Sequence, residues 1–114
     1  MKREVIYSVE YVDFLTKSDE RTQEKLLYVV SILENVQVLS AKFVKKLINT
    51  DFYELRVSVE NEIRVIIFSA DNENISIAQK IILLNAFVKK DKKDYNREVK
   101  KAMKILRRIL LYEK

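Results

Sequence analysis

Two arginines, Arg56 and Arg64, are the residues of this sequence best suited to hold an anion between them. Arg56 lies in a segment of alternating apolar and polar residues and Arg64 in a mainly apolar one, and residues 59–61 separate the two segments, which predicts an antiparallel hairpin. A three-residue hairpin loop ends in a left-handed residue, and Asn61 is the best candidate because the chain has no glycine. This loop sets Arg56 directly opposite Arg64 on the more polar face of the hairpin.

Like charges directly opposite each other destabilise a strand pair, so this pair of arginines needs an anionic partner. A phosphate is one solution, because the planar guanidinium fork binds two phosphate oxygens at once. The alternative is that each arginine pairs with a carboxylate of the same hairpin, such as Glu54 or Glu62. Both interpretations stay open at the level of sequence.

Three missing residue types limit the chemistry that this site could perform. Without cysteine there is no disulfide, thiol nucleophile or cysteine-based metal site. Without histidine the commonest general base and metal ligand is absent, and without glycine there is no glycine-rich phosphate loop. Acid–base work would therefore fall to lysine, arginine, tyrosine, aspartate or glutamate, and we expect no metal ion and no cofactor.

The positive charge of the chain is concentrated near its C-terminus. Residues 1–88 carry 11 Lys and Arg against 13 Asp and Glu, whereas residues 89–114 carry 11 against 4. A basic segment on a near-neutral body predicts contact with nucleic acid, although a solvated helix face would give the same pattern. No signal peptide and no apolar stretch of membrane-spanning length is expected, so we expect one cytoplasmic domain over residues 1–114.

The periodicity of apolar residues predicts a small α+β domain with an antiparallel sheet, in the order β-α-α-β-β-β-α. Ser18 is the expected N-cap of the longer of the first two helices. Residues 37–51 fit either a short helix or a loop, and a bulge or break is expected near Gln79-Lys80. The expected elements are a strand at 5–9, helices at 11–17 and 19–36, strands at 53–60, 63–70 and 75–88, and a basic amphipathic helix at 94–112.

Four segments, in order and at fixed spacing, resemble the RelE/ParE superfamily of bacterial toxins, and most closely its HigB-like, phage-related branch. The resemblance covers about residues 5–110, with Ala86 where that branch has a glycine. The segments are Tyr53-Glu54-Leu55-Arg56, Ile63-Arg64-Val65-Ile66-Ile67-Phe68, Leu83-Leu84-Asn85-Ala86-Phe87-Val88-Lys89-Lys90 and Lys92-Lys93-Asp94-Tyr95-Asn96-Arg97-Glu98-Val99-Lys100-Lys101-Ala102.

The resemblance implies a RelE-like fold and the toxin of a type II toxin–antitoxin pair. Most members of this branch cleave mRNA in the ribosomal A site, so the implied partners are mRNA, ribosomal RNA and an antitoxin that is acidic or carries a helix-turn-helix domain. Two other functions stay open. One is inhibition of DNA gyrase, as in ParE-like proteins, and the other is a basic RNA- or protein-binding module without catalysis.

The catalytic residues that the resemblance and the required chemistry imply are Arg56, Arg64, Lys89 and Tyr95. The arginines would clamp the scissile phosphate, and Lys89 would bind a flanking phosphate. Tyr95 would serve as acid, base or stacking surface, and the role of base requires a lowered pKa. The expected RNA- or ribosome-binding residues are Lys45, Lys46, Lys90, Lys92, Lys93, Arg97, Lys100, Lys101 and Lys104.

Overall fold

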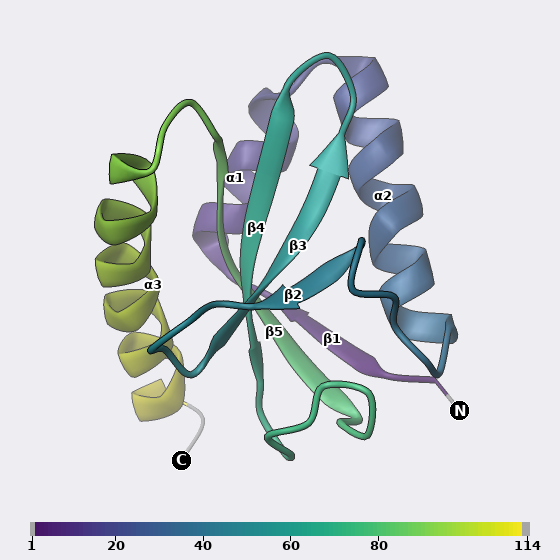
Figure 1. Cartoon of the computed structure of the whole chain (residues 1–114), viewed down its shortest axis with the longest axis vertical. Helices are drawn as coiled ribbons and strands as arrows, with labels where there is room; N and C mark the ends of the chain where they lie inside the picture. Colours follow the sequence, from purple (N-terminus) through teal and green to yellow (C-terminus); the bar gives the residue numbers. More distant parts are fainter. Residues whose placement is uncertain (1, 113–114) are drawn as a thin grey trace.

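The computed structural model of the protein describes residues 2–112 and has the expected α+β architecture. One short strand, β2, is added within residues 37–51, where the sequence fitted a short helix or a loop. The elements of this part of the chain are β1 (Glu4–Tyr7), α1 (Val9–Lys17), α2 (Glu20–Asn35), β2 (Val44–Lys46), β3 (Phe52–Ser58), β4 (Glu62–Ser69), β5 (Lys80–Val88) and α3 (Lys93–Tyr112) (Figure 1).

The five strands form one sheet in the order β1-β5-β4-β3-β2. The pairs from β2 to β5 are antiparallel as expected, whereas β1 runs parallel to β5 and makes the sheet mixed. The direction of β1 relative to β5 depends on how the connection through α1 and α2 crosses the sheet. Alternation of apolar and polar residues along a strand does not indicate that direction. The strand expected at 75–88 is shorter, because residues 75–79 form a turn-rich connection and β5 begins at Lys80. The register shift lies at Ile66/Ile67 of β4 and not near Gln79-Lys80.

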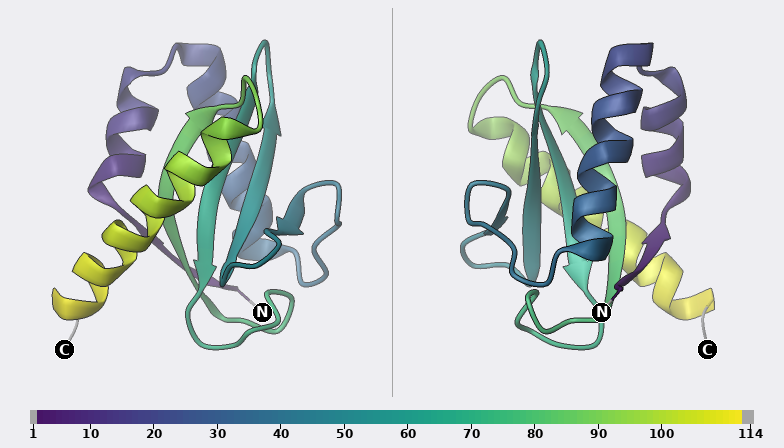
Figure 2. Two further views of the ribbon diagram at one scale, coloured as in Figure 1. Left: turned by 60° about the vertical axis from the view of Figure 1, so that its left-hand side comes forward. Right: turned by 90° about the vertical axis from the view of Figure 1, so that its right-hand side faces the viewer.

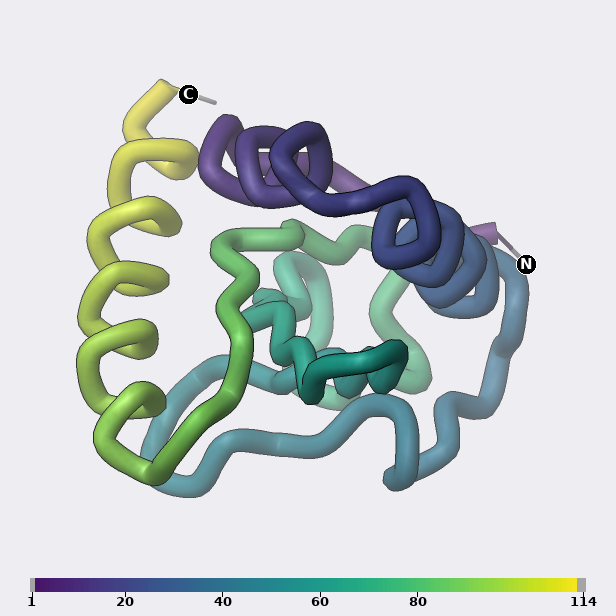
Figure 3. Tube along the Cα trace, turned by 90° about the horizontal axis from the view of Figure 1, so that it is seen from above, coloured from purple at the N-terminus to yellow at the C-terminus, as the bar shows by residue number. Residues whose placement is uncertain are grey.

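Helices cover both faces of the sheet. Leu26 and Leu33 of α2 belong to the same buried cluster as Leu55 of β3, on the face that α1 and α2 cover. Ala102 and Ile105 of α3 belong to a second cluster on the opposite face. Figures 2 and 3 show this layering, with α3 on one side of the strands and α1 and α2 on the other. No helix within residues 2–112 is both long and apolar enough to cross a membrane.

The hairpin between β3 and β4 has the predicted register. Ser58 pairs with Glu62 and Arg56 pairs with Arg64, both confirmed by the strand pairing. The prediction of a left-handed conformation at Asn61 is wrong. Among the described residues the positive φ belongs to Asn49, at 61°, in the connection between β2 and β3.

The N-cap of α2 differs from the prediction by one residue. The side chain of Asp19, and not of Ser18, accepts the N–H of Thr22 (2.8 Å) and caps α2. Ser18 is occupied elsewhere, because it is the C-cap of α1 and its hydroxyl donates to the carbonyl of Phe14 (2.7 Å). A local hydrogen bond at the end of one helix therefore competes with capping of the next.

Polar contacts fix α3 on the sheet. The buried Glu98 accepts a hydrogen bond from the Asn85 amide of β5 (3.0 Å), so a carboxylate inside the interface has a donor. Further along, Arg108 makes a two-pronged pair with Glu10 of α1 (2.6 and 2.7 Å). These contacts hold the first turn of α3, which contains Tyr95, at a defined distance from β3 and β4.

Candidate functional site

The centre of the candidate site is a carboxylate, that of Glu54. One oxygen accepts the Nε–H of Arg56 (3.0 Å), and the other accepts the hydroxyl proton of Tyr95 (2.6 Å). Arg64 Nε donates to the Tyr95 hydroxyl (3.2 Å) and lies 3.8 Å from the same carboxylate. The cluster therefore joins neighbouring strands to α3 through one buried glutamate and one tyrosine.

The two arginines differ in how they are held. The Arg64 side chain is 8% exposed, and its Nη1 also donates to Glu62 (3.3 Å) and to the carbonyl of Ile63 (3.1 Å). The Arg56 side chain is 34% exposed and keeps much of its guanidinium free of that network. Each arginine therefore has a carboxylate partner, the alternative to phosphate that the sequence allowed. Arg56 is the arginine that a further anion can reach.

Tyr95 is held in its protonated form. Burial raises its pKa, and the hydrogen bond to Glu54 and the charge of that carboxylate raise it further, while Arg64 acts in the opposite direction. The ring also packs edge-on against Phe87, with 5.5 Å between ring centroids. The pKa of Tyr95 is therefore raised and not lowered, which contradicts the role of general base, and its hydroxyl is placed to donate a proton.

A spectrophotometric titration should detect this shift in pKa. Replacing Tyr95 by phenylalanine should remove one tyrosine that ionises above pH 10, because the raised pKa keeps its phenol protonated beyond the usual range. The measurement is the ultraviolet absorbance of tyrosinate as a function of pH, wild type minus variant. Loss of a group that ionises below pH 10 would contradict the geometry.

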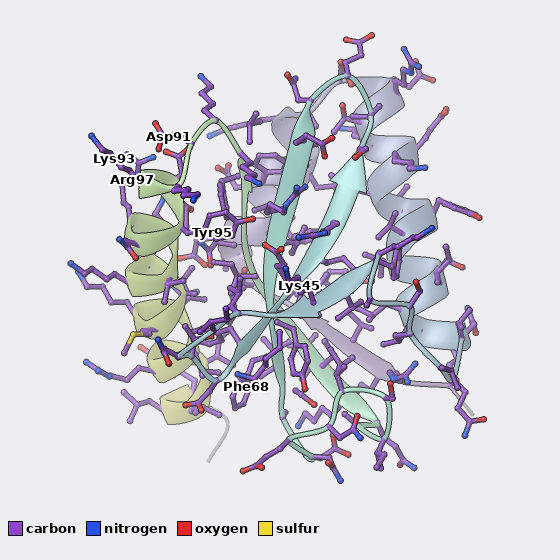
Figure 4. The ribbon with its side chains drawn as sticks, in the orientation of Figure 1. Lys45, Phe68, Asp91, Lys93, Tyr95 and Arg97 are labelled. Atoms are coloured by element: carbon purple, nitrogen blue, oxygen red, sulfur yellow. The ribbon has the colours of Figure 1, made fainter. Side chains whose placement is uncertain are left out.

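The cluster forms one wall of a groove of about 660 Å³ between α3, β3 and the β2–β3 connection, which we call the α3 groove. Three of the expected RNA-binding lysines, Lys45, Lys46 and Lys100, line it together with Arg56 and Tyr95. In Figure 4, Tyr95 points from α3 toward the sheet and Lys45 lies over the same region, whereas Lys93 and Arg97 extend away from it. The groove thus has a basic rim around one buried carboxylate.

The remaining expected residues are spread more widely. Lys89 lies beside the cluster, with its Nζ 5.8 Å from the centre of the Tyr95 ring. Lys101 faces α1, because it lines a separate hollow there with Glu10. The others lie on the exposed surface of the β5–α3 connection and of α3, namely Lys90, Lys92, Lys93, Arg97 and Lys104. The structure therefore gathers part of the predicted basic set at the groove and leaves the rest on the outer surface.

Glu54 is the residue that sequence reasoning named only as an ion-pair partner and did not place in the catalytic set. The signal was present, since Glu54 shares the parity of Arg56 along the strand and so must lie on the same face. Its importance comes from Tyr95, which lies 41 positions further along the chain. No local pattern could indicate that contact.

Comparison with known proteins identifies the family of the chain. Residues 13–107 match the sequence profile of the family described as phage derived protein Gp49-like (DUF891). A comparison with curated proteins gives no match. The matched segment includes every residue of the cluster and most of the fold around it. The chain therefore belongs to the phage-derived Gp49-like family, a toxin-like family of RelE type.

Proposed function

We propose that the protein is the toxin of a toxin–antitoxin pair and that it cleaves mRNA on the ribosome without a metal ion. The observation that carries this proposal is the cluster itself. A carboxylate, an accessible arginine and a protonated tyrosine meet at the wall of a basic groove. These are the three kinds of group that cleavage of RNA by its own 2′-hydroxyl requires.

Each group has a role in the proposed reaction. The Glu54 carboxylate accepts the proton of the 2′-hydroxyl as the 2′-oxygen attacks the adjacent phosphorus. Arg56 stabilises the negative charge that builds on the phosphate oxygens. Tyr95 donates its proton to the departing 5′-oxygen, so the products are a 2′,3′-cyclic phosphate and a 5′-hydroxyl end.

Arg64 has a positioning role in this scheme. It donates to the Tyr95 hydroxyl oxygen and is mostly buried, and it does not line the α3 groove. Burial lowers the pKa of Arg64, but its hydrogen bonds to Tyr95 and Glu62 outweigh this and raise it overall, so its charge is retained. Charge reversal at Arg64 would bury a carboxylate beside Glu54, so Arg56 is the better position for a test that must leave the fold intact.

The partners follow from the charge of the surface. Ribosomal RNA and mRNA are polyanions, and the lysines of the α3 groove and of the exposed α3 surface supply the complementary charge. An antitoxin would neutralise the toxin by covering this surface with an acidic segment, and it would carry its own helix-turn-helix or acidic region. The proposed site of action is the bacterial cytoplasm.

The proposal is tested by expressing the wild type and Arg56→Ala in bacteria and mapping RNA 5′ ends. The wild type should arrest growth and create new ends inside translated reading frames, whereas Arg56→Ala should lose about 10²- to 10³-fold of the cleavage, as expected for removal of one charge-stabilising donor. Arg21→Ala is the matched control, because Arg21 is exposed, pairs with Glu60 and does not line the α3 groove. Arrest with intact mRNA and broken DNA would replace this function by gyrase inhibition.

A further inference from the structure

A second groove lies on the other side of Arg56, between α2 and the β3–β4 hairpin, and we call it the α2 groove. Its volume is about 450 Å³. It exists because β2 pairs with only three residues of β3, Tyr53 to Leu55, so the end of β3 pairs with β4 on one side and has no strand beside it on the other. Arg56 lines both grooves, so the α3 groove and the α2 groove meet at this guanidinium.

The side chains of the α2 groove combine positive charge with an exposed aromatic ring. Tyr28 of α2 is 61% exposed, and Lys25 Nζ lies 5.6 Å from the centre of its ring. Lys42 lines the groove from the connection between α2 and β2 and is exposed. The acidic residue of the lining, Glu62, is already paired with Arg64. The charge that remains available is therefore positive.

We propose that the α2 groove is a nucleotide-binding subsite for single-stranded RNA. The base next to the phosphate held at Arg56 stacks on Tyr28, and the following phosphate lies near Lys25 and Lys42. Aromatic rings beside cations bind single strands in this way, since every base has a flat face and every linkage carries a charge. The inference rests on the proposed function and adds the path of the substrate, from the α3 groove across Arg56 into the α2 groove.

Continuity with Arg56 favours RNA over a protein segment as the occupant. A strand that places one phosphate at Arg56 must continue in both directions, and both grooves open from that point. A docking protein would be expected to use the neighbouring exposed Leu27 as well, which is 60% exposed on the same helix but lines neither groove. Leu27 therefore distinguishes the two occupants.

The test measures binding of a short, fluorescently labelled single-stranded RNA with 2′-O-methyl groups, which cannot be cleaved, to the full chain by fluorescence anisotropy. Tyr28→Ala should weaken binding about 5- to 100-fold through loss of one stacked base. Tyr28→Phe keeps the ring and should bind like the wild type, and so should the matched control Leu27→Ala. Lys42→Gln should reduce the slope of log Kd against log salt by about 0.7.

The outcomes separate this inference from the proposed function. Tight binding that depends on Tyr28, with no mRNA cleavage in cells, would leave the subsite in place and overturn the nuclease. Cleavage by the wild type together with no effect of Tyr28→Ala on binding would overturn the subsite, as would a wild type that does not bind the RNA. The subsite would also be overturned if Tyr28→Ala and Leu27→Ala left RNA binding unchanged and weakened binding of a co-expressed antitoxin equally. That result would assign the α2 groove to a protein partner.

Discussion

Substitution of Glu54 by glutamine is expected to lower the single-turnover rate of mRNA cleavage by about 10²- to 10⁴-fold, the contribution of a positioned proton acceptor. The amide has the size of the carboxylate, and its oxygen can still accept the Tyr95 hydroxyl that Glu54 accepts at 2.6 Å. What is lost is the negative charge and with it the ability to take a proton. The measurement is cleavage on programmed ribosomes with toxin in excess.

RNA binding should change in the opposite direction in the same variant. Glu54 lies 3.0 Å from Arg56 Nε and 3.8 Å from Arg64 Nε, and it neutralises part of their charge. Without that carboxylate the groove becomes more positive, so a non-cleavable RNA should bind as tightly as to the wild type or more tightly. A fall in rate with unchanged or stronger binding is the signature of a lost chemical step.

Glu62→Gln is the matched control for this experiment. Glu62 is also a partner of Arg64, but its side chain is 55% exposed and lies outside the α3 groove. Its replacement should leave the rate within a few-fold of the wild type. An unchanged cleavage rate in Glu54→Gln would show that a lysine of the groove, and not Glu54, accepts the proton. Loss of both cleavage rate and RNA binding would show that Glu54 only positions the other groups.

Substitution of Arg3 by methionine is expected to have the largest effect on stability. The Arg3 side chain is buried, and its guanidinium donates to five backbone carbonyls at 2.5–3.0 Å. They belong to the end of α2 and the residues after it, and to the segment before β5, namely Leu33, Val36, Gln37, Ser76 and Ala78. One side chain thus joins three parts of the fold at the β1 edge of the sheet.

Methionine keeps the apolar stem but removes every donor. Carbonyls that are buried lose their partners, at about 1–3 kcal/mol for each group left unsatisfied. Because water can replace some of these donors, we expect a loss of at least about 3 kcal/mol in the free energy of unfolding, and a fall in Tm of about 10–20 °C. Urea and thermal unfolding, followed by circular dichroism, measure both quantities.

The neighbouring Lys2 supplies the control for Arg3. It carries the same charge at the same end of the chain but is exposed, so Lys2→Met should change the unfolding free energy by less than about 0.5 kcal/mol. Equal stability of Arg3→Met and wild type would show that the five carbonyls are satisfied by water without cost. Burial lowers the pKa of Arg3, and the carbonyl dipoles around its guanidinium stabilise the charge.

The sequence alone determined the features that depend on neighbouring residues. The loop of three residues at 59–61, between two strand-forming segments, set Arg56 opposite Arg64, because register in a hairpin follows from loop length. The α+β class and the amphipathic character of α3 followed from periodicity in the same way. One local detail, the N-cap of α2, was misplaced by one residue because two helix ends compete for the same short stretch of chain.

Only the tertiary structure decided which of these residues form a site. Glu54 and Tyr95 meet because α3 crosses the face of the sheet that holds the arginines, and that crossing depends on buried contacts between α3 and β5. The α2 groove exists because β2 is too short to cover β3. The pKa of Tyr95 rises, and does not fall, because burial beside a carboxylate outweighs the neighbouring arginine. Packing across the sheet sets all three, since they depend on distances between segments that are remote in the chain.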